Sequence, residues 1–302
     1  MNAFRWLIQT VVALGTNSYF RFLFGGSLIY QGPLKAVCHP GLNCYACPAA
    51  LFSCPVGAVQ NFATSLRFTP PGSFPHTGSM VLGYLGFIGT LVGRLPCGWL
   101  CPFGFIQDLL YKIPTPKISL WRPLRYGKYL ILVITVLIMP LFVLDHSGLG
   151  HPWFCKLICP AGTLLGALPL IVLQPDLWQT LGFYFWNKMT ILALIIILAI
   201  FISRFFCRTL CPLGAFYALF SRTTLIKLDY LAGNCLHCQA CLKVCPTEIT
   251  PYEEQDSPEC IMCLKCVDAC KFHALDFGLR HFAGAKASQA AQPPSVIPGK
   301  KT

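Results

Sequence analysis

Long apolar stretches alternate with polar segments through the first two thirds of the chain. A bilayer crossing needs about 20 mostly apolar residues, and fewer where flanking residues snorkel or the bilayer thins. Four stretches meet this requirement: Trp6 to Tyr30, Met80 to Leu95, Tyr129 to Leu144, and Phe183 to Ile202. The first also contains Asn17 and Arg21, whose polar groups should face protein or water rather than lipid. The pattern predicts four membrane-spanning helices.

A shorter apolar stretch, 162–173, contains Pro169. Its length suits a re-entrant half-helix better than a fifth span. A fifth crossing would also place the basic, Cys-rich C-terminal region outside, against the distribution of charge.

Basic residues flank the predicted spans unequally. Two regions are rich in them: Arg94, Lys112, Lys117, Arg122, Arg125 and Lys128 in the first, and Arg204, Arg208, Arg222 and Lys227 in the second. Segments 31–78 and 145–182 hold only Lys35, Arg67 and Lys156. Because Lys and Arg concentrate on the cytoplasmic side, the sequence predicts a multi-pass protein of the inner (cytoplasmic) membrane with both termini cytoplasmic.

Composition agrees with a lipid-embedded chain. Of its 302 residues, 55% are hydrophobic and 11% charged, which does not describe a soluble surface. The net charge of +12 comes without a basic stripe interleaved with aromatic residues, so we expect no nucleic-acid partner. The chain has 18 cysteines and no recognisable cleavable signal peptide, which favours metal ligands over a disulfide scaffold.

The strongest motif lies between Asn234 and Lys271. It repeats the spacing Cys-x2-Cys-x2-Cys-x3-Cys, with cysteines at Cys235, Cys238, Cys241, Cys245 and at Cys260, Cys263, Cys266, Cys270. This is the bacterial ferredoxin spacing, in which the fourth cysteine of each run binds the other cluster. One 4Fe-4S cluster is thus predicted on Cys235, Cys238, Cys241 and Cys270, and a second on Cys260, Cys263, Cys266 and Cys245. A pair of zinc sites is the alternative.

A second pattern repeats in the apolar part. Segments 94–104, RLPCGWLCPFG, and 204–214, RFFCRTLCPLG, share Arg-x2-Cys-x3-Cys-Pro-x-Gly. The segment WFCKLICPAG places Cys155 and Cys159 in the same way, and SCPVG holds Cys54. A proline after the cysteine suits the first turn of a helix, whose free N–H groups favour an anionic cluster.

We call each Cys-Pro segment of this repeat a corner. Because one predicted span lies between successive corners, they should alternate between the inner and outer sides of the membrane. The inner corners supply a complete predicted ligand set: Cys97, Cys101, Cys207 and Cys211. On the outer side the repeat favours Cys47, Cys54, Cys155 and Cys159, and the rival set is Cys38, Cys44, Cys47 and Cys54. Disulfides are a further alternative there, above all for Cys38 and Cys44.

Few other residues are candidates for chemistry. Asp145, His146 and His151 at the outer end of the third span could accept quinol protons or simply cap the span, and Asp108 is the inner counterpart. The four predicted spans contain no histidine, so haem is not expected.

The paired corners, CGWLCP and CRTLCP, followed by a two-cluster module resemble the NapH and MauN type of membrane iron-sulfur proteins. They are also similar to the membrane parts of NosR-type and CcoG-type polyferredoxins. The resemblance covers roughly residues 80 to 275. It implies electron transfer between a quinone pool or cytoplasmic donor and an extracytoplasmic redox system. The corner at Cys155 and Cys159 and the four outer cysteines depart from the family pattern and suggest an additional outward centre.

We therefore expect an α-helical membrane protein of four transmembrane helices with re-entrant Cys-Pro corners, plus a small α+β ferredoxin domain. The predicted divisions are a membrane domain, 1–225, a two-cluster domain, 226–282, and a disordered tail, 283–302. The predicted function is that of an electron-transfer subunit, an oxidoreductase component with 4Fe-4S clusters and a quinone as the candidate cofactors. Expected partners are other subunits of a membrane redox complex, a quinone or a cytochrome or ferredoxin, and membrane lipid. Alternatives are a one-sided quinol dehydrogenase component and an accessory factor for metal-centre maturation or sensing.

Overall fold

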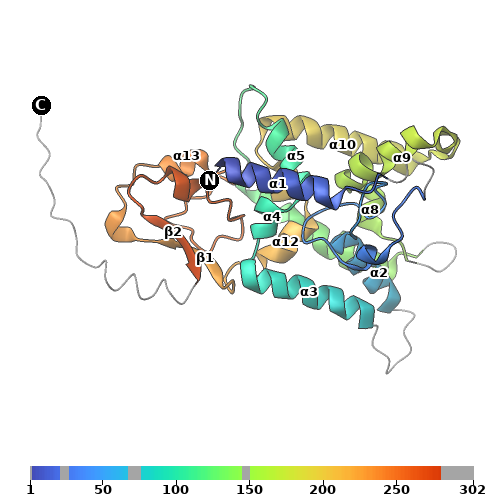
Figure 1. Ribbon diagram of the computed structural model, residues 1–302, viewed down its shortest axis with the longest axis horizontal. Coiled ribbons are helices and arrows are strands. Elements are labelled where there is room, and N and C mark those ends of the chain that lie inside the picture. Colours follow the sequence, from blue (N-terminus) through green and yellow to red (C-terminus); the bar gives the residue numbers. More distant parts are fainter. Residues whose placement is uncertain (1, 21–26, 67–75, 145–149, 280–302) are drawn as a thin grey trace, which may run out of the picture.

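The computed structural model describes residues 2–20, 27–66, 76–144 and 150–279 (Figure 1). A body of helices makes up most of the molecule, and a smaller C-terminal domain with a two-stranded sheet lies at one end of the long axis. The architecture is predominantly helical, as predicted. The predicted tail, 283–302, lies outside the described residues.

The body is built from long helices joined by short ones. In chain order its α-helices are α1 (Asn2–Thr16), α2 (Pro55–Leu66), α3 (His76–Val92), α4 (Leu95–Trp99), α5 (Pro102–Leu110), α6 (Gly127–Ile131), α7 (Met139–Phe142), α8 (Trp153–Leu157), α9 (Leu168–Leu173), α10 (Phe183–Phe201), α11 (Phe205–Thr209) and α12 (Pro212–Ala218). Turns of 3-10 or π type extend or connect these helices: η2 (Pro33–Ala36), η3 (Arg122–Tyr126), η4 (Leu132–Ile138), η5 (Gly162–Ala167) and η6 (Pro175–Thr180).

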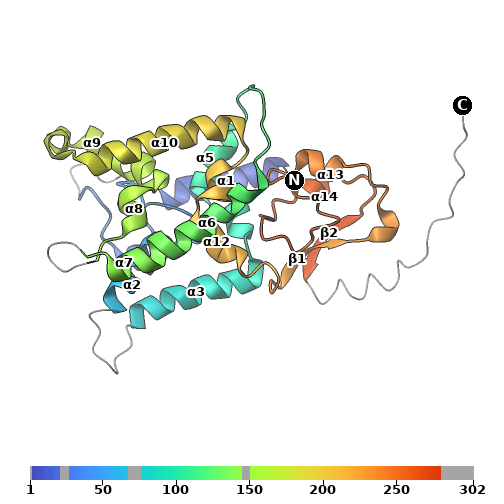
Figure 2. The ribbon, with the colours of Figure 1, turned by 180° about the vertical axis from the view of Figure 1, so that it is seen from behind.

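Two helices in the described residues are long and apolar enough to cross a membrane, Arg122–Phe142 and Phe183–Phe201. They overlap the third and fourth predicted spans. Two shorter apolar helices, Ser79–Val92 and Gly162–Leu173, correspond to the second predicted span and to the predicted half-helix. Figure 2 shows α10, the helix from α6 to α7, and α3 running along the same long axis.

The first predicted span is shorter than expected. Helix α1 ends at Thr16, where the side-chain amide of Asn17 donates a 3.0 Å hydrogen bond to the Ala13 carbonyl. An asparagine side chain that binds the last turn competes with continuation of the helix. The described residues 17–20 and 27–30 are not helical, and Arg21 lies outside the described residues.

Pro140 does not interrupt the helix at the third predicted span. It lacks an N–H, and its ring would crowd the carbonyl four residues before it in a regular α-helix. The helix instead passes through the π-turn η4, Leu132–Ile138, before α7 begins at Met139. A π-turn widens the helix and rearranges its hydrogen bonds, so the chain stays continuous from Arg122 to Phe142.

Three of the Cys-Pro steps in the repeat start a helix at the proline, as the sequence predicts. Pro55 begins α2, Pro102 begins α5 and Pro212 begins α12. Cys101 and Cys211 are the N-cap residues of their helices, and each sulfur accepts the N–H of the glycine three residues later at 3.4 Å. The cysteine sulfurs therefore lie at helix N-termini.

The C-terminal domain pairs its first and last elements. Strand β1 (Ile226–Tyr230) lies antiparallel to β2 (Leu275–Leu279), with Leu228 opposite Phe277. The 3-10 turn η7 (Ala232–Asn234) and the helices α13 (Ala240–Val244) and α14 (Lys265–Ala269) lie between the strands. α13 and α14 pack against each other, so the two Cys-rich runs are neighbours.

Candidate iron-sulfur centres

The inner corners bring four thiols together. Cys97 and Cys101 flank the end of α4, and Cys207 and Cys211 hold the same places on α11. All four side chains are buried, and the Cys211 thiol lies within electrostatic range of the other three. We call this set the inner group.

Two buried arginines tie the inner corners to each other. Arg204 donates from Nη1 to the Cys97 carbonyl at 2.6 Å, and Arg94 donates from Nη2 to the Cys207 carbonyl at 3.3 Å. Each arginine begins one copy of the repeat and binds the first cysteine of the other copy. The exchange holds the two corners face to face, and it places positive charge beside the thiols.

N–H groups also point at the inner sulfurs. The Leu42 N–H reaches Cys101 Sγ at 3.4 Å, in addition to that of Gly104, and the Gln107 side-chain amide reaches Cys207 Sγ at 3.0 Å. Such donors stabilise a negatively charged sulfur, and hydrogen bonds to the sulfurs are a known determinant of cluster potential.

A second set of four thiols lies at the end of the body away from the C-terminal domain, near α2 and α8 (Figure 1). The Cys159 thiol is within electrostatic range of Cys155, Cys44 and Cys54. Tyr45 lies within range of the same four sulfurs. We call Cys44, Cys54, Cys155 and Cys159 the outer group.

The outer group differs from the predicted set in one member. Cys44 stands in place of Cys47: a Cβ on Gly166 would lie 3.1 Å from Cys44 Sγ, and one on Gly162 would be close to both Cys159 and Cys44. Cys47 lies beside Cys44 and Lys35. Cys38 is not among the sulfurs that act on Cys159 or Tyr45, and it lies within electrostatic range of Tyr84 and Tyr217.

The ferredoxin motifs form two hollows in the C-terminal domain. One is lined by Cys235, Cys238, Cys241 and Cys270, and the other by Cys245, Cys260, Cys263 and Cys266. Each hollow thus combines three cysteines of one motif with the fourth of the other. This is the crossed arrangement that the spacing predicts.

The backbone conformation is the same around the cysteines of the two motifs. Left-handed conformations occur at equivalent positions of the two motifs, in the pairs His237 and Met262, Gln239 and Leu264, and Glu248 and His273. Left-handed residues turn the chain sharply and aim successive N–H groups at one point, which makes an anion-binding concavity. The two halves are therefore built alike around two separate centres.

Burial favours the protonated form of three of the free thiols. It raises the pKa of Cys155 to about 11, and it raises the pKa of Cys207 and of Cys260 to about 12. A bare thiolate is disfavoured in such surroundings, so a positive partner such as iron must replace the proton. Within the described residues, no three Cys, His, Asp or Glu side chains converge as a single metal ion would need. A cubane binds its thiolates through separate irons, and the residues fit that larger group.

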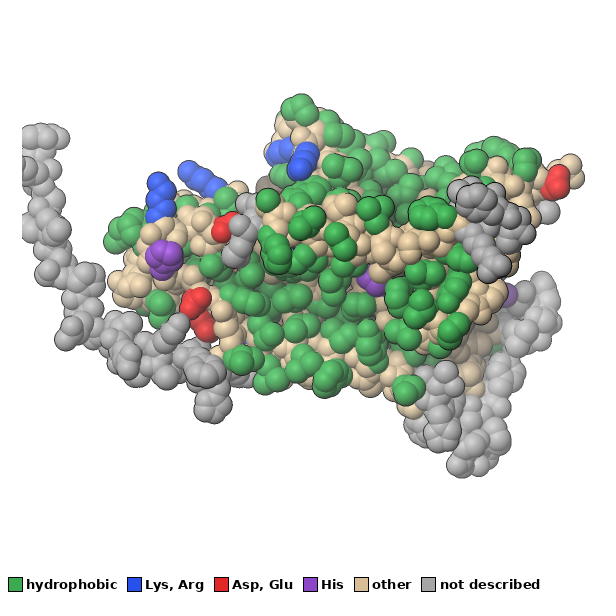
Figure 3. All heavy atoms as spheres, viewed as in Figure 1, with side chains coloured by type: hydrophobic (Ala, Val, Ile, Leu, Met, Phe, Trp, Pro, Cys, Tyr) green, Lys and Arg blue, Asp and Glu red, His purple; other side chains and the backbone are tan. Residues whose placement is uncertain are grey.

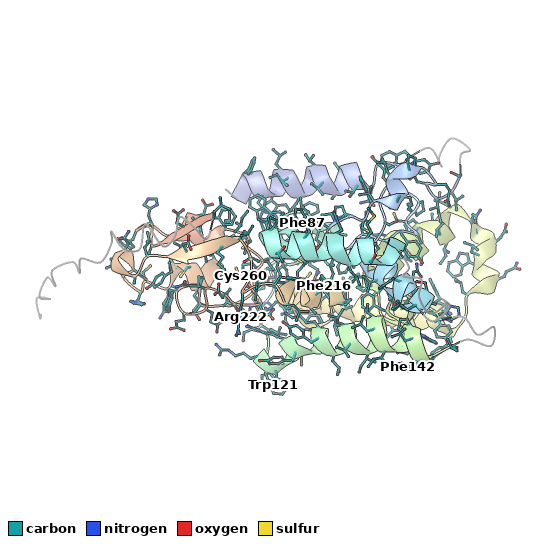
Figure 4. The ribbon with its side chains drawn as sticks, turned by 90° about the horizontal axis from the view of Figure 1, so that it is seen from below. Phe87, Trp121, Phe142, Phe216, Arg222 and Cys260 are labelled. Carbon is teal, nitrogen blue, oxygen red and sulfur yellow. The ribbon has the colours of Figure 1, made fainter. Side chains whose placement is uncertain are left out.

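The second hollow borders the inner group. Trp99 donates from Nε1 to the Met262 carbonyl at 2.8 Å, and Cys263 is within electrostatic range of Arg5 and Arg204. Figure 4 shows Cys260 where the C-terminal domain meets the body. We therefore call the hollow around Cys260 the near hollow, because it borders the body. We call the hollow around exposed Cys238 the far hollow.

Asp108 and His151, the other candidate residues that the structure describes, both contact neighbouring side chains. Asp108 binds Arg204 at 2.6 Å and Arg5 at 3.2 Å. Burial alone would raise the pKa of Asp108, but the two arginines outweigh it and hold the pKa below its ordinary value. Asp108 is therefore a buried counter-ion. His151 packs edge to face on Trp153, and Asp145 and His146 lie outside the described residues.

Sequence reasoning missed Gln60 and Gln107. Each is the sixth residue after a Cys-Pro cysteine, and each donates to a sulfur of the facing corner. Aligning the corners beyond the Cys-Pro-x-Gly core would have found this repeat.

Comparison with known proteins places the chain in a class. The family described as a 4Fe-4S binding domain matches residues 75–120, 129–170 and 186–229, and the family described as a 4Fe-4S dicluster domain matches residues 218–280. No solved structure matches. The chain is an iron-sulfur electron-transfer protein with 4Fe-4S clusters and a ferredoxin-type domain.

Curated relatives narrow the class. An uncharacterized protein of Methanocaldococcus jannaschii is 30% identical over 197 residues, which cover 62% of this chain and 73% of that protein. The protein YccM of Escherichia coli is 27% identical over 254 residues, which cover 78% of this chain and 65% of that protein. The ferredoxin-type protein NapH of Haemophilus influenzae is 26% identical, covering 64% and 65%. With the proteins named MauN also matching, the chain belongs to the NapH/MauN-type family of 4Fe-4S proteins.

Proposed function

We propose that this chain carries electrons across the inner membrane through four 4Fe-4S clusters arranged in a line. The order runs from the far hollow to the near hollow, then to the inner group and then to the outer group. The observation that carries the proposal is the succession, along the long axis of the molecule, of the elements that hold or adjoin these sets: α13 in the C-terminal domain, then α4 and α12, then α2 and α8 (Figure 1). Electron tunnelling weakens steeply with distance, so a line of neighbouring centres is what a conduit needs.

The two groups in the body are close neighbours. The Leu42 N–H binds Cys101 Sγ of the inner group at 3.4 Å, and Cys44 of the outer group follows only two residues later. Two residues of extended chain span about 7 Å at most. The segment 42–44 therefore bridges the two proposed clusters directly.

The surface supports placement in a membrane. Figure 3 shows hydrophobic side chains covering the face formed by α1 and α3, between the C-terminal domain and the opposite end. Phe87 on α3 and Phe142 at the end of α7 are 64% and 71% exposed, which is costly in water and favourable in lipid. We propose four spans with cytoplasmic termini, as the basic flanks predict.

A quinol dehydrogenase is the second candidate. An apolar cavity lies between the Cys54-Pro55 and Cys211-Pro212 corners, with Leu132 and Phe216 in its wall. All of its lining residues are apolar. A quinone headgroup needs hydrogen-bond partners, which makes this cavity a poor quinone site, so the conduit is the better-supported function.

Sealed vesicles containing the purified chain test the conduit. We expect about 16 iron atoms per chain, four for each cubane, and reduction of an impermeant acceptor on one side by a donor on the other. Cys44→Ser and Cys155→Ser should abolish transfer while leaving the ferredoxin signals intact.

Cys47→Ser is the matched control, because Cys47 is buried next to Cys44 but lies outside the outer group. It should transfer electrons as the unmodified chain does. An iron content near eight, which the ferredoxin domain alone would give, would refute the conduit, as would unimpaired transfer in Cys155→Ser.

A further inference from the structure

Gln60 and Gln107 make the same contacts at two different places in the body. Gln107 donates from Nε2 to Cys207 Sγ at 3.0 Å and accepts the Phe206 N–H on Oε1 at 3.1 Å. Gln60 donates to Cys155 Sγ at 3.3 Å and accepts the Phe154 N–H at 2.9 Å. In both cases one amide spans the first cysteine of the facing corner and the phenylalanine before it.

The amide groups are fully used and held rigidly. Besides its sulfur, each Nε2 donates to the carbonyl four residues earlier in its own helix, Val56 for Gln60 and Phe103 for Gln107. The backbone N–H fixes the side-chain oxygen on its side and leaves the NH2 group facing the sulfur. Both glutamines are buried, with 0% and 1% of their surface exposed. Water therefore does not compete for these bonds.

The arrangement follows the pairing of the corners. Gln60 follows Cys54 and binds the corner of Cys155, and Gln107 follows Cys101 and binds the corner of Cys207. The equivalent positions after Cys159 and Cys211 are Leu165 and Tyr217. Each group thus has one such glutamine. In both groups the glutamine belongs to the corner that comes earlier in the chain and binds the corner that comes later.

We propose that Gln107 sets the reduction potential of the inner cluster and Gln60 that of the outer cluster, each through its N–H···S bond to one ligating cysteine. The inference rests on the proposed function, since it needs a cluster in each group. A cluster that accepts one electron becomes more negative, and its sulfurs then accept hydrogen bonds more strongly. The amide keeps its protons throughout, so the bond stabilises the reduced state and raises the potential. The glutamines are positioning residues.

A mediated redox titration with dithionite, followed by EPR, tests the proposal on the full chain. Gln107→Leu should lower the ratio of reduced to oxidised inner cluster about tenfold at fixed potential, which equals about 59 mV for a one-electron couple. The outer signal should not move. Gln60→Leu should shift the outer signal alone. Gln9→Leu is the control, because Gln9 is buried and donates to the Gly98 carbonyl rather than to a sulfur.

A second variant and a second measurement guard against misfolding. Gln107→Met keeps the side-chain length without an N–H, and it should shift the same signal by a similar amount. The Fe–Sγ stretching band in resonance Raman spectra should rise, because the freed sulfur donates more density to iron. Unmoved potentials with iron retained would overturn the proposal. Iron loss from both the leucine and the methionine variants would also overturn the proposal, because it would show that Gln107 is needed to assemble the cluster rather than to set its potential. Missing body clusters in the unmodified chain would instead refute the proposed function.

Discussion

Gly98 shows how one residue sets the approach of two domains. It follows Cys97 in α4, and a Cβ at this position would collide with the Ile261 carbonyl and lie 3.8 Å from the Cys263 Cα. The other copy of the corner has Arg208 at this place, and that side chain pairs with Glu248 at 2.9 Å. The two copies have thus diverged to fit two different loops of the C-terminal domain.

Gly98→Ala should loosen the junction between the domains. Overpacking of this kind costs about 1 to 3 kcal/mol, and the backbone carbonyl of Ile261 cannot rotate away as a side chain can. We expect faster limited proteolysis between α12 and β1, with the iron content of the ferredoxin domain unchanged. Gly83→Ala is the control, because nothing lies within 4 Å of a Cβ there. Equal digestion of both variants would contradict the argument.

At the scale of elements, the strongest sequence signals concern local structure. The helix Phe183–Phe201 differs from the fourth predicted span by one residue, because an unbroken apolar run fixes a helix without help from its neighbours. The choice of Cys44 over Cys47 depends instead on how segment 38–47 folds between the two groups. That loop has no periodicity, and the Leu42 contact with Cys101 crosses more than fifty residues of sequence. Similarly, the end of α1 depends on a single Asn17 side chain.

The crossed arrangement of the ferredoxin motifs predicts which cluster each cysteine substitution affects. Cys245→Ser should alter the near cluster, although Cys245 belongs to the first motif, and Cys270→Ser should alter the far cluster. EPR of the full chain, with iron quantitation, separates the two. Only the first variant should change the magnetic interaction with the inner group, because the near hollow borders the body.

Each of these variants is the control for the other, since both remove the last cysteine of a motif. Disturbance of the far cluster by Cys245→Ser would overturn the crossed assignment. The same result from both variants would mean that the two clusters do not assemble independently.

On the scale of the whole molecule, opposite charges gather at the junction. Arg94, Lys128 and Arg208 are buried in the body and face Glu259 and Glu248 of the C-terminal domain. Arg125 adds a 3.3 Å hydrogen bond to the Thr247 carbonyl. Buried pairs of this kind add little net stability, but removing one partner leaves the other uncompensated. They therefore fix the docking position of the domain, and with it the gap between the near cluster and the inner group.

Glu259→Gln should release this docking. Burial alone would raise the pKa of Glu259, yet Arg94 and Lys128 outweigh it and hold the pKa below the ordinary value of 4.5. The carboxylate is thus ionised at neutral pH, and its contribution is present above pH 4.5 and lost as the pH falls through the lowered pKa. At neutral pH the variant removes the carboxylate that pairs with Arg94 and Lys128, and breaking a buried ion pair in this way costs about 3 to 5 kcal/mol.

The measurement is transfer from a soluble donor to the inner cluster, followed by rapid-freeze EPR, together with proteolysis of the linker. Glu259→Gln should slow this step and expose the linker, while the potentials of both ferredoxin clusters stay near their original values. Asp256→Asn is the matched control: Asp256 pairs with Lys227 but is 49% exposed, so its loss should cost less than about 1 kcal/mol. If Glu259→Gln transferred electrons at the original rate, the ion pairs of Glu259 would not hold the near cluster in line, and docking would rest on the remaining junction contacts, such as Arg208 with Glu248 and Trp99 with the Met262 carbonyl.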